Sequence, residues 1–194
     1  MALKLSVKIG NVTNLSDARY AAGMGVDYIG FNINNSSENL VKANTFKEIT
    51  NWISGVGIIG EIGENHPINK EEYPAYLTET TNSSQLNEES ILRFNVRKLS
   101  FAEIEDLFNP TYNVHFYILD LSANQVEDYK NELASLCANW PIYISSDFNE
   151  ALLSTVVNTI KPKGIEIKGG LEEQPGFKDY DGIADVLEWL EEEE

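Results

Sequence analysis

Short runs of β-branched and aromatic residues alternate with longer segments of helical spacing along the chain, and this alternation restricts the fold more than any other feature. The expected strands are residues 5–9, 28–33, 57–62, 83–86, 96–99, 114–119, 142–145 and 164–167. The expected helices lie near residues 15–24, 46–52, 70–77, 88–93, 101–108, 124–137, 150–160 and 183–190. Strict alternation implies a parallel sheet covered by helices, and eight units favour a compact, closed (β/α)8 TIM barrel of eight parallel strands.

The length fits one barrel with short loops. The chain has 194 residues, whereas about 250 is typical of such barrels and about 200 is the low end. We therefore expect a single barrel domain over residues 1–194. Several helices should begin at a side chain that accepts a backbone N–H bond and is followed by Glu or Gln in a capping box. The expected pairs are Thr45 with Glu48, Ser100 with Glu103, Ser122 with Gln125 and Asp147 with Glu150.

The charge balance argues against several classes of partner. The 14 Lys and Arg residues stand against 31 Asp and Glu residues, and the formal net charge of −17 repels nucleic acids and anionic membrane surfaces. The single cysteine, Cys137, allows no intrachain disulfide and fits a reducing cytoplasm. No signal peptide and no run of about 18 apolar residues is visible. We expect a cytoplasmic protein with no nucleic-acid or membrane partner, and either a monomer or a homodimer.

Metal and cofactor sites are not indicated. The two histidines, His66 and His115, and the one cysteine do not form a ligand set of the kind that zinc sites use. No Gly-x-Gly-x-x-Gly follows an expected strand, and this motif is the best sign of a dinucleotide site. We therefore expect no metal and no cofactor.

Motifs at both ends of the chain and in its middle match those of a known family in order. The opening VKIGNVTNLSDARYAAGMGVDYIGFNI contains the matching residues Lys8, Ile9, Thr13, Asn14, Asp17, Ala18, Gly25, Asp27, Gly30 and Phe31. The segment KGIEIKGGLEEQPGFKD contributes Gly170, Pro175, Gly176, Lys178 and Asp179, and the middle contributes Gln85, Leu86 and Asp120. In these motifs the chain resembles phosphoribosylanthranilate isomerase, a (β/α)8 enzyme of tryptophan biosynthesis.

The resemblance implies an aldose–ketose isomerisation, the Amadori rearrangement of N-(5-phosphoribosyl)anthranilate. In that family the cysteine of a Lys-Ile-Cys-Gly motif is the general base, and the aspartate that ends strand six is the general acid. An acid and a base that flank a substrate hold different protonation states near neutral pH. By resemblance, Asp120 is the candidate acid, and a phosphorylated sugar-type molecule is the candidate ligand.

The position of the family's base carries no reactive side chain here. Gly10 stands where the family has cysteine, and the amide of Asn11 beside it is not a base at neutral pH. In the second loop, Asn39 stands where the family has the arginine that binds the anthranilate carboxylate, so a charged bidentate partner is lost. These substitutions predict that the family reaction is impaired or lost.

The expected phosphate site is only partly retained. The family's Gly-Gly pair on strand seven is Ser145-Ser146 in this chain. On strand eight, Lys168 and Gly169 precede Gly170, and glycine backbone with a nearby lysine can still hold a phosphate. A plain turn explains the two glycines equally well. Catalytic groups of such barrels lie at the carboxyl ends of the strands, where the pocket residues are expected to be Lys8, Asn11, Asn39, Gln85, Glu166 and Lys168.

Two interpretations of these residues stay open. Asp120 is either a retained acid or a carboxylate that hydrogen-bonds at a strand end. Lys8 lies on the same face of its strand as Gly10 and should point into the barrel with Asp120 and Glu166, as a structural ion network or as a catalytic set. The chain is accordingly a divergent isomerase with another base or a non-catalytic barrel that binds a ligand or a protein.

Overall fold

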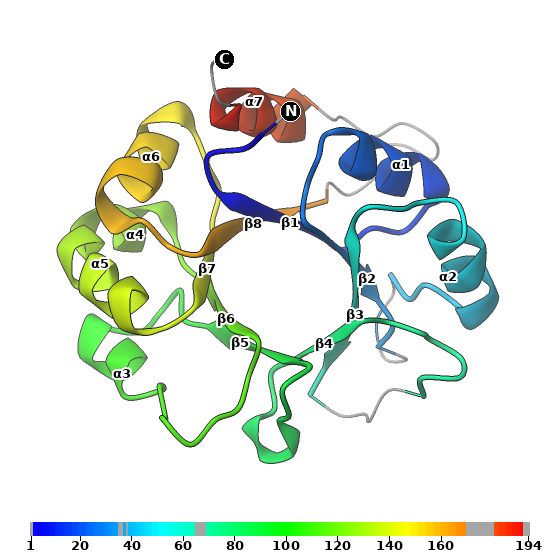
Figure 1. Cartoon of the computed structure of the whole chain (residues 1–194). Coiled ribbons are helices and arrows are strands. Elements are labelled where there is room, and N and C mark those ends of the chain that lie inside the picture. The colour runs from blue at the N-terminus through cyan, green and yellow to red at the C-terminus, as the bar shows by residue number, and fades with distance from the viewer. Residues whose placement is uncertain (1, 35–36, 38, 65–68, 170–180, 192–194) are drawn as a thin grey trace.

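The computed structural model describes residues 2–34, 37, 39–64, 69–169 and 181–191. Eight parallel strands follow one another around a closed barrel, with each strand paired to the next and β8 paired to β1 (Figure 1). The strands are β1 (Ser6–Gly10), β2 (Tyr28–Asn32), β3 (Gly57–Gly63), β4 (Leu77–Thr80), β5 (Ser90–Asn95), β6 (Phe116–Asp120), β7 (Ile142–Ser145) and β8 (Gly164–Lys168). The expectation of a (β/α)8 TIM barrel is confirmed.

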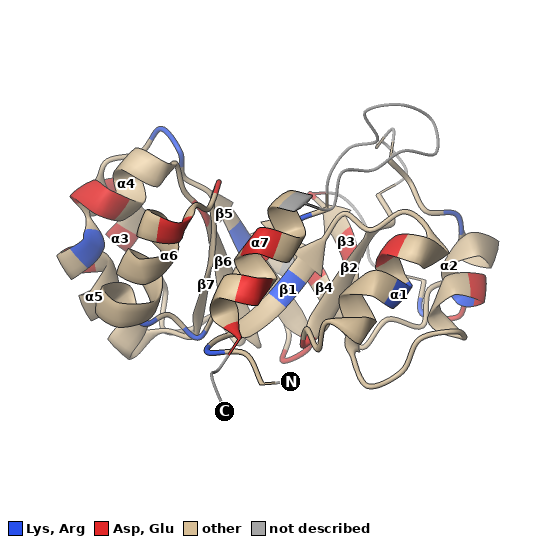
Figure 2. Ribbon diagram, turned by 90° about the horizontal axis from the view of Figure 1, so that it is seen from above, with Lys and Arg blue, Asp and Glu red and all other residues tan. Residues whose placement is uncertain are grey.

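Helices surround most of the barrel, as the views along and across it show (Figures 1 and 2). They are α1 (Leu15–Gly23), α2 (Ala43–Thr50), α3 (Phe101–Glu105), α4 (Ala123–Asp128), α5 (Lys130–Asn139), α6 (Glu150–Thr155) and α7 (Asp181–Leu190), with a 3-10 turn η1 (Ser83–Gln85) and a π-helical turn η2 (Val156–Ile160). Within the described residues, no helix is long and apolar enough to cross a membrane.

Two of the expected strands and two of the expected helices were wrong. Strand β4 is Leu77–Thr80 and not the expected 83–86. Strand β5 is Ser90–Asn95 and not the expected 96–99, and it lies where a helix was expected at 88–93. Residues 70–77 contain turns and the start of β4 instead of a helix. The chain therefore builds this sector of the barrel with turns in place of helices over the described residues, which is how it closes eight strands within a short length.

Helix starts follow the capping rule at two of the four expected places. Ser100 caps α3 and Ser122 caps α4 in complete capping boxes. Helix α2 instead begins after Lys42, whose side chain makes no capping bond, and Asn149 caps α6 by accepting a hydrogen bond from the Leu152 N–H. The expectations for Thr45 and Asp147 as caps were wrong, because each helix starts at a different residue.

Two apolar regions lie on opposite sides of the strands. The larger one packs the outer faces of the strands against the helices. The smaller one groups residues from β3 to β7 and includes Ile59, Leu77 and Ile91, all buried. Side chains two residues apart share one face of a strand, so the residue two positions beyond each of these three faces the barrel interior nearer to the carboxyl ends. Those residues are charged, and they form the site described next.

Candidate functional site

A pocket of about 470 Å³ opens at the carboxyl ends of the strands. Its walls include Gly10 at the end of β1 and Asn11 just after it, Asn95 at the end of β5, Asp120 at the end of β6, and Lys168 with Gly169 at the end of β8. Three glutamates, Glu61, Glu79 and Glu166, also line it. This is the end of a (β/α)8 barrel where ligand sites are usually built.

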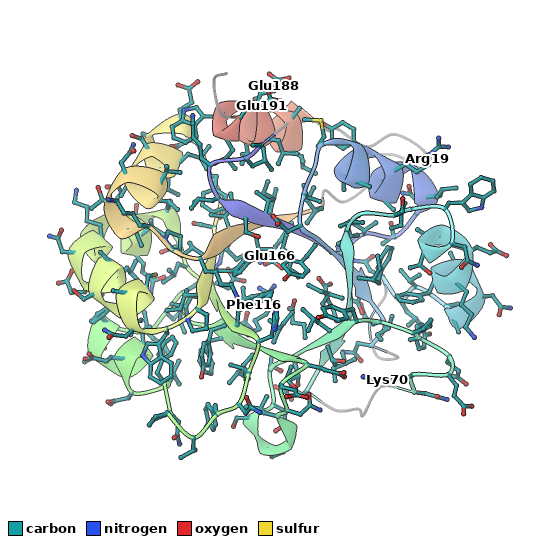
Figure 3. All side chains as sticks on the ribbon, viewed as in Figure 1. Arg19, Lys70, Phe116, Glu166, Glu188 and Glu191 are labelled. Atoms are coloured by element: carbon teal, nitrogen blue, oxygen red, sulfur yellow. The ribbon has the colours of Figure 1, made fainter. Side chains whose placement is uncertain are left out.

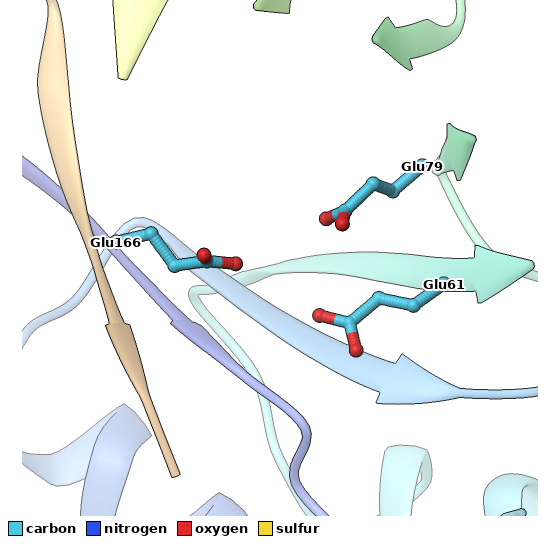
Figure 4. A group of neighbouring side chains, drawn as sticks. All are labelled: Glu61, Glu79 and Glu166. Carbon is cyan, nitrogen blue, oxygen red and sulfur yellow. The ribbon is translucent and has the colours of Figure 1, made fainter. Parts of the chain in front are cut away.

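The floor of the pocket is an ion cluster centred on Lys8. The Lys8 side chain is fully buried, and its Nζ lies 2.7 Å from Glu61 Oε1, 2.7 Å from Glu79 Oε2 and 2.5 Å from Glu166 Oε1. The carboxylates come from β3, β4 and β8 and point toward one another (Figure 4). The barrel therefore brings together three acidic groups that are far apart in sequence and holds them around one ammonium group.

Arg93 on β5 supplies the second cation of this cluster. Its guanidinium donates through Nε to Glu79 Oε1 and through Nη2 to Glu166 Oε1. Glu166 extends into the barrel interior (Figure 3), and its side chain is 1% exposed. We call Lys8, Glu61, Glu79, Arg93 and Glu166 the inner charge cluster. It holds three carboxylates and two cations, so its net charge is −1 when all five groups are ionised.

The pKa values of the groups in the inner charge cluster are shifted in different directions. Burial favours the neutral form and raises the pKa of Glu61, and the attraction of Lys8 does not fully offset it. Burial acts the same way on Glu79 and Glu166, but Arg93 and Lys8 outweigh it and lower both pKa values. Burial alone would lower the pKa of Lys8, yet the three carboxylates raise it. Glu61 is thus the carboxyl of the cluster that gains a proton most readily.

The three carboxylates have the spacing of a cation site. Ligand oxygens of Glu61, Glu79 and Glu166 all lie within 4.8 Å of one another. The Lys8 ammonium already contacts all three carboxylates. A metal ion would have to displace that ammonium, whose pKa the same carboxylates raise. The arrangement therefore fits an ion-paired lysine better than a metal ion.

Gly10 and Gly30 make room for Glu61. A Cβ atom at Gly10 would lie 2.8 Å from Glu166 Oε1, 2.9 Å from Glu61 Oε1 and 3.1 Å from Lys8 Nζ, and a Cβ at Gly30 would overlap the Glu61 carboxylate. Contacts below 3.0 Å require something to shift. The inner charge cluster therefore occupies the space of a side chain at position 10, which is the position of the base in the resembled family.

Asp120 lies at the rim of the pocket in a separate set of ion pairs. Its Oδ1 accepts a hydrogen bond from Arg97 Nε at 2.7 Å and its Oδ2 accepts one from Lys168 Nζ at 2.7 Å. Arg97 also pairs with Asp147 at 3.0 Å. Partial burial would raise the pKa of Asp120, but the bonds from Lys168 and Arg97 lower it. The carboxyl is therefore ionised at neutral pH, with both cations at the rim already paired.

The other residues expected at the site lie in several different places. Gly169 lines the pocket, and its N–H donates to the Gly10 carbonyl at 2.8 Å. Ser145 is buried at the end of β7, while Ser146 Oγ donates to the Leu121 carbonyl at 3.0 Å. Neither serine is among the described residues that line the pocket.

Three further residues expected at the site either lie away from the pocket or are not among the described residues. The Asn39 N–H donates to Ser37 Oγ, and Asn39 is not among the described wall residues. Gln85 lies in the turn η1 beyond the end of β4 instead of on the fourth strand. Gly170 lies outside the described residues, as do Pro175, Gly176, Lys178 and Asp179 of the resembled motif.

The site residues expected from the sequence leave out three members of the inner charge cluster: Glu61, which lies at an expected strand end but was given no role, and Glu79 and Arg93. Each stands two positions after a buried apolar residue, namely Ile59, Leu77 and Ile91. This period-two pairing of an apolar residue with a charged one was visible in the sequence. It was not recognised because barrel interiors are expected to be filled mainly by apolar side chains.

The closed parallel barrel and the polar pocket at the carboxyl ends of its strands define a (β/α)8 barrel protein with a small-molecule type of site. No family model matches the chain. It is 24% identical over 200 residues to the N-(5'-phosphoribosyl)anthranilate isomerase of Pelodictyon phaeoclathratiforme, covering 89% of this chain and 91% of that protein. The protein of the same name from Chlorobium phaeobacteroides is 21% identical over 206 residues, covering 90% of this chain and 92% of that protein.

Solved structures agree on the fold. The phosphoribosylanthranilate isomerase of Thermotoga maritima superposes with a TM-score of 0.72 at 17% identity, over 94% of this chain and 96% of that chain. The enzyme of Thermococcus kodakaraensis gives 0.71 at 18% identity, over 95% and 98%. A further isomerase structure, which holds reduced 1-(o-carboxyphenylamino)-1-deoxyribulose 5-phosphate, gives 0.67 at 18% identity, over 95% of this chain and 97% of that chain. Together the comparisons show that the chain is similar in sequence to curated phosphoribosylanthranilate isomerases over about 90% of its length and that it shares the (β/α)8 fold of the solved isomerases.

Proposed function

We propose that this barrel has lost the isomerisation of N-(5-phosphoribosyl)anthranilate and that its strand-end pocket binds a small polar molecule. One observation carries the proposal: the carboxylates of Glu61 and Glu166 occupy the space where the family's base would project from position 10. Loss of a catalytic base alone commonly costs about 10²–10⁴ in rate. The chain keeps the barrel and a pocket large enough for a small molecule. The charged groups of that pocket do not have the arrangement that the isomerisation needs.

The rim of the pocket supports the same conclusion. A general acid must carry a proton at the working pH, whereas the pKa of Asp120 is lowered by its bonds with Lys168 and Arg97. Both cations are already paired with carboxylates. A phosphorylated substrate would have to break these pairs to reach a positive charge, which opposes binding of the family substrate.

The test is rescue of a bacterial strain that lacks phosphoribosylanthranilate isomerase on tryptophan-free medium. We expect no growth with this chain and none with its Gly10→Cys variant, and growth with the Thermotoga maritima enzyme as the positive control. Purified protein should likewise not convert N-(5-phosphoribosyl)anthranilate. Robust rescue that disappears in an Asp120→Asn variant would overturn the proposal and indicate an active isomerase with a different base.

A further inference from the structure

The inner charge cluster has one more negative group than positive groups, and it lies at the floor of a pocket. Among the described residues, the cations that pair with Glu61, Glu79 and Glu166 are Lys8 and Arg93. Buried charges are stable only when they are paired and hydrogen-bonded. The cluster as it stands therefore lacks one positive charge, and the open side from which one can arrive is the pocket.

The negative charge that no cation of the cluster balances lies mainly at Glu61. Of the three carboxylates it is the most open to the pocket, with 15% of its side chain exposed against 7% for Glu79 and 1% for Glu166. Arg93 bonds Glu79 and Glu166, and the described contacts include no bond from Arg93 to Glu61. Besides Lys8, the one donor to Glu61 among the described residues is the Asn11 N–H, at 3.2 Å from Oε2. A donor that entered the pocket would therefore meet Glu61 first.

A second observation points independently to a ligand with hydrogen-bond donors. Glu166 Oε2 is buried at the pocket and has no hydrogen-bond partner among the described residues, although Oε1 of the same carboxylate accepts hydrogen bonds from Lys8 and Arg93. Leaving a buried acceptor unpaired is costly, and the cost is greater for a charged group. The pocket therefore offers a carboxylate oxygen that can still accept a hydrogen bond, next to a carboxylate whose negative charge is not balanced.

The walls of the pocket add neutral polar groups. Asn11 and Asn95 line it, and the described contacts include no hydrogen bond of either amide side chain. An amide offers both a donor and an acceptor, which suits hydroxyl groups. The cations at the rim, Arg97 and Lys168, are paired with carboxylates. The pocket thus offers carboxylate and amide groups to a ligand, but no unpaired cation among the described residues.

We propose that the pocket binds a small, hydroxyl-rich molecule that carries a protonated amine, with the ammonium group against Glu61 and hydroxyl groups against Asn11 and Asn95. This inference rests on the proposed function, because it assumes that the pocket no longer serves the phosphorylated family substrate. A metal ion is a poorer occupant because Lys8 Nζ already contacts all three carboxylates. A phosphate is a poorer occupant because the nearby cations are paired.

The experiment compares matched probes by NMR titration of the full chain at neutral pH. Glucamine and sorbitol share a six-carbon polyol chain and differ in that one end carries an ammonium group in glucamine and a hydroxyl in sorbitol. We expect glucamine to bind at least about tenfold more tightly, the gain that one charge-assisted hydrogen bond in a partly desolvated site supplies. Ribose 5-phosphate, the anionic probe, should bind more weakly than sorbitol.

Variants assign the preference to Glu61. Glu61→Gln removes the charge and leaves the cluster with two carboxylates and two cations, so it should fold and should bind glucamine and sorbitol equally. Glu48→Gln is the matched control, because Glu48 is an exposed residue of α2 that is not part of the pocket wall, and it should keep the tenfold preference.

Several results would overturn the inference. These are equal binding of glucamine and sorbitol to the wild type, tighter binding of ribose 5-phosphate, no binding of glucamine, or a preference that persists in Glu61→Gln. The proposed function fails separately, through turnover of N-(5-phosphoribosyl)anthranilate. A protein that shows no turnover and no preference for glucamine would leave the proposed function standing and remove only the ligand class.

Discussion

Glycines at positions 10 and 30 determine where the Glu61 carboxylate can lie. A Cβ at either position would meet that carboxylate, and a Cβ at Gly10 would meet Glu166 as well. The sequence alone shows Gly10 as the absence of a base, whereas the fold gives the glycine a positive role, because it admits a buried carboxylate. The glycine at position 10 and the buried carboxylate of Glu61 therefore depend on each other.

Gly10→Cys is expected to destabilise the protein and, if the proposed function is right, to show no isomerase activity. The new side chain must push Glu61 and Glu166 away from Lys8, and crowding of this kind in a packed interior costs about 1–3 kcal/mol. The measurement is the free energy of unfolding in urea. Gly23→Ala is the control, since nothing lies within 4 Å of a Cβ there, and in α1 it should be neutral or stabilising by up to about 1 kcal/mol. A Gly10→Cys variant as stable as the wild type would contradict this interpretation.

Glutamine substitutions should separate Glu61 from Glu166, because glutamine resembles the protonated carboxyl. The pKa of Glu166 is lowered by Lys8 and Arg93 against the effect of burial, so its ionised form stabilises the fold. Glu166→Gln weakens two charge-assisted hydrogen bonds and should cost about 1.5–3 kcal/mol. Burial raises the pKa of Glu61, so its ionised form is unfavourable and Glu61→Gln should be neutral or stabilising at neutral pH. The measurement is again urea unfolding.

The pH dependence of the two variants should have opposite sign. For Glu166, whose folded pKa is lowered, the stabilising effect is present above the unfolded pKa of about 4.5 and is lost as the pH falls toward the folded value. For Glu61, whose folded pKa is raised, the wild type loses stability as the pH rises from the unfolded pKa through the folded one. The advantage of Glu61→Gln over the wild type should therefore grow from acid toward neutral pH. A constant advantage would show that charge is not its cause.

At the scale of the elements, the sequence predicted six strands near their observed positions and misplaced β4 and β5. The reason is physical. Glu79 and Arg93 face the barrel interior within these two strands, so neither strand is the continuous apolar run expected of a parallel sheet buried on both faces. The same two side chains belong to the inner charge cluster. The two strands that were hardest to predict thus contribute two of the five residues of the inner charge cluster.

Capping offers a test of how local sequence determines the helices. Ser122→Ala removes the capping box of α4, in which Ser122 and Gln125 bond each other's backbone N–H groups, and should cost about 1 kcal/mol of stability. Thr45→Ala is the comparison, because Thr45 is an exposed residue inside α2 that does not cap it. It should be neutral or slightly stabilising, since alanine is the better helix former. Equal losses in thermal unfolding of the two variants would contradict the observed helix starts.

At the scale of the whole molecule, most of the charge imbalance lies outside the barrel. The net charge is −17, and the inner charge cluster accounts for one unit of it. Acidic residues are spread over the surrounding helices (Figure 2). Surface charges of one sign repel one another and oppose the compact state, and salt screens this repulsion because the Debye length falls from about 30 Å at 0.01 M to about 3 Å at 1 M.

Sodium chloride should therefore raise the thermal unfolding temperature, and the effect should come from the surface and not from the inner charge cluster. We expect a rise of about 2–4 °C between low and high salt, which corresponds to roughly 1 kcal/mol for a chain of this size. Buried ion pairs are screened much less than exposed ones, so Glu61→Gln should show nearly the same dependence on salt as the wild type. A fall in the unfolding temperature with salt would mean that exposed attractive pairs, such as Lys70 with Glu89, outweigh the general repulsion.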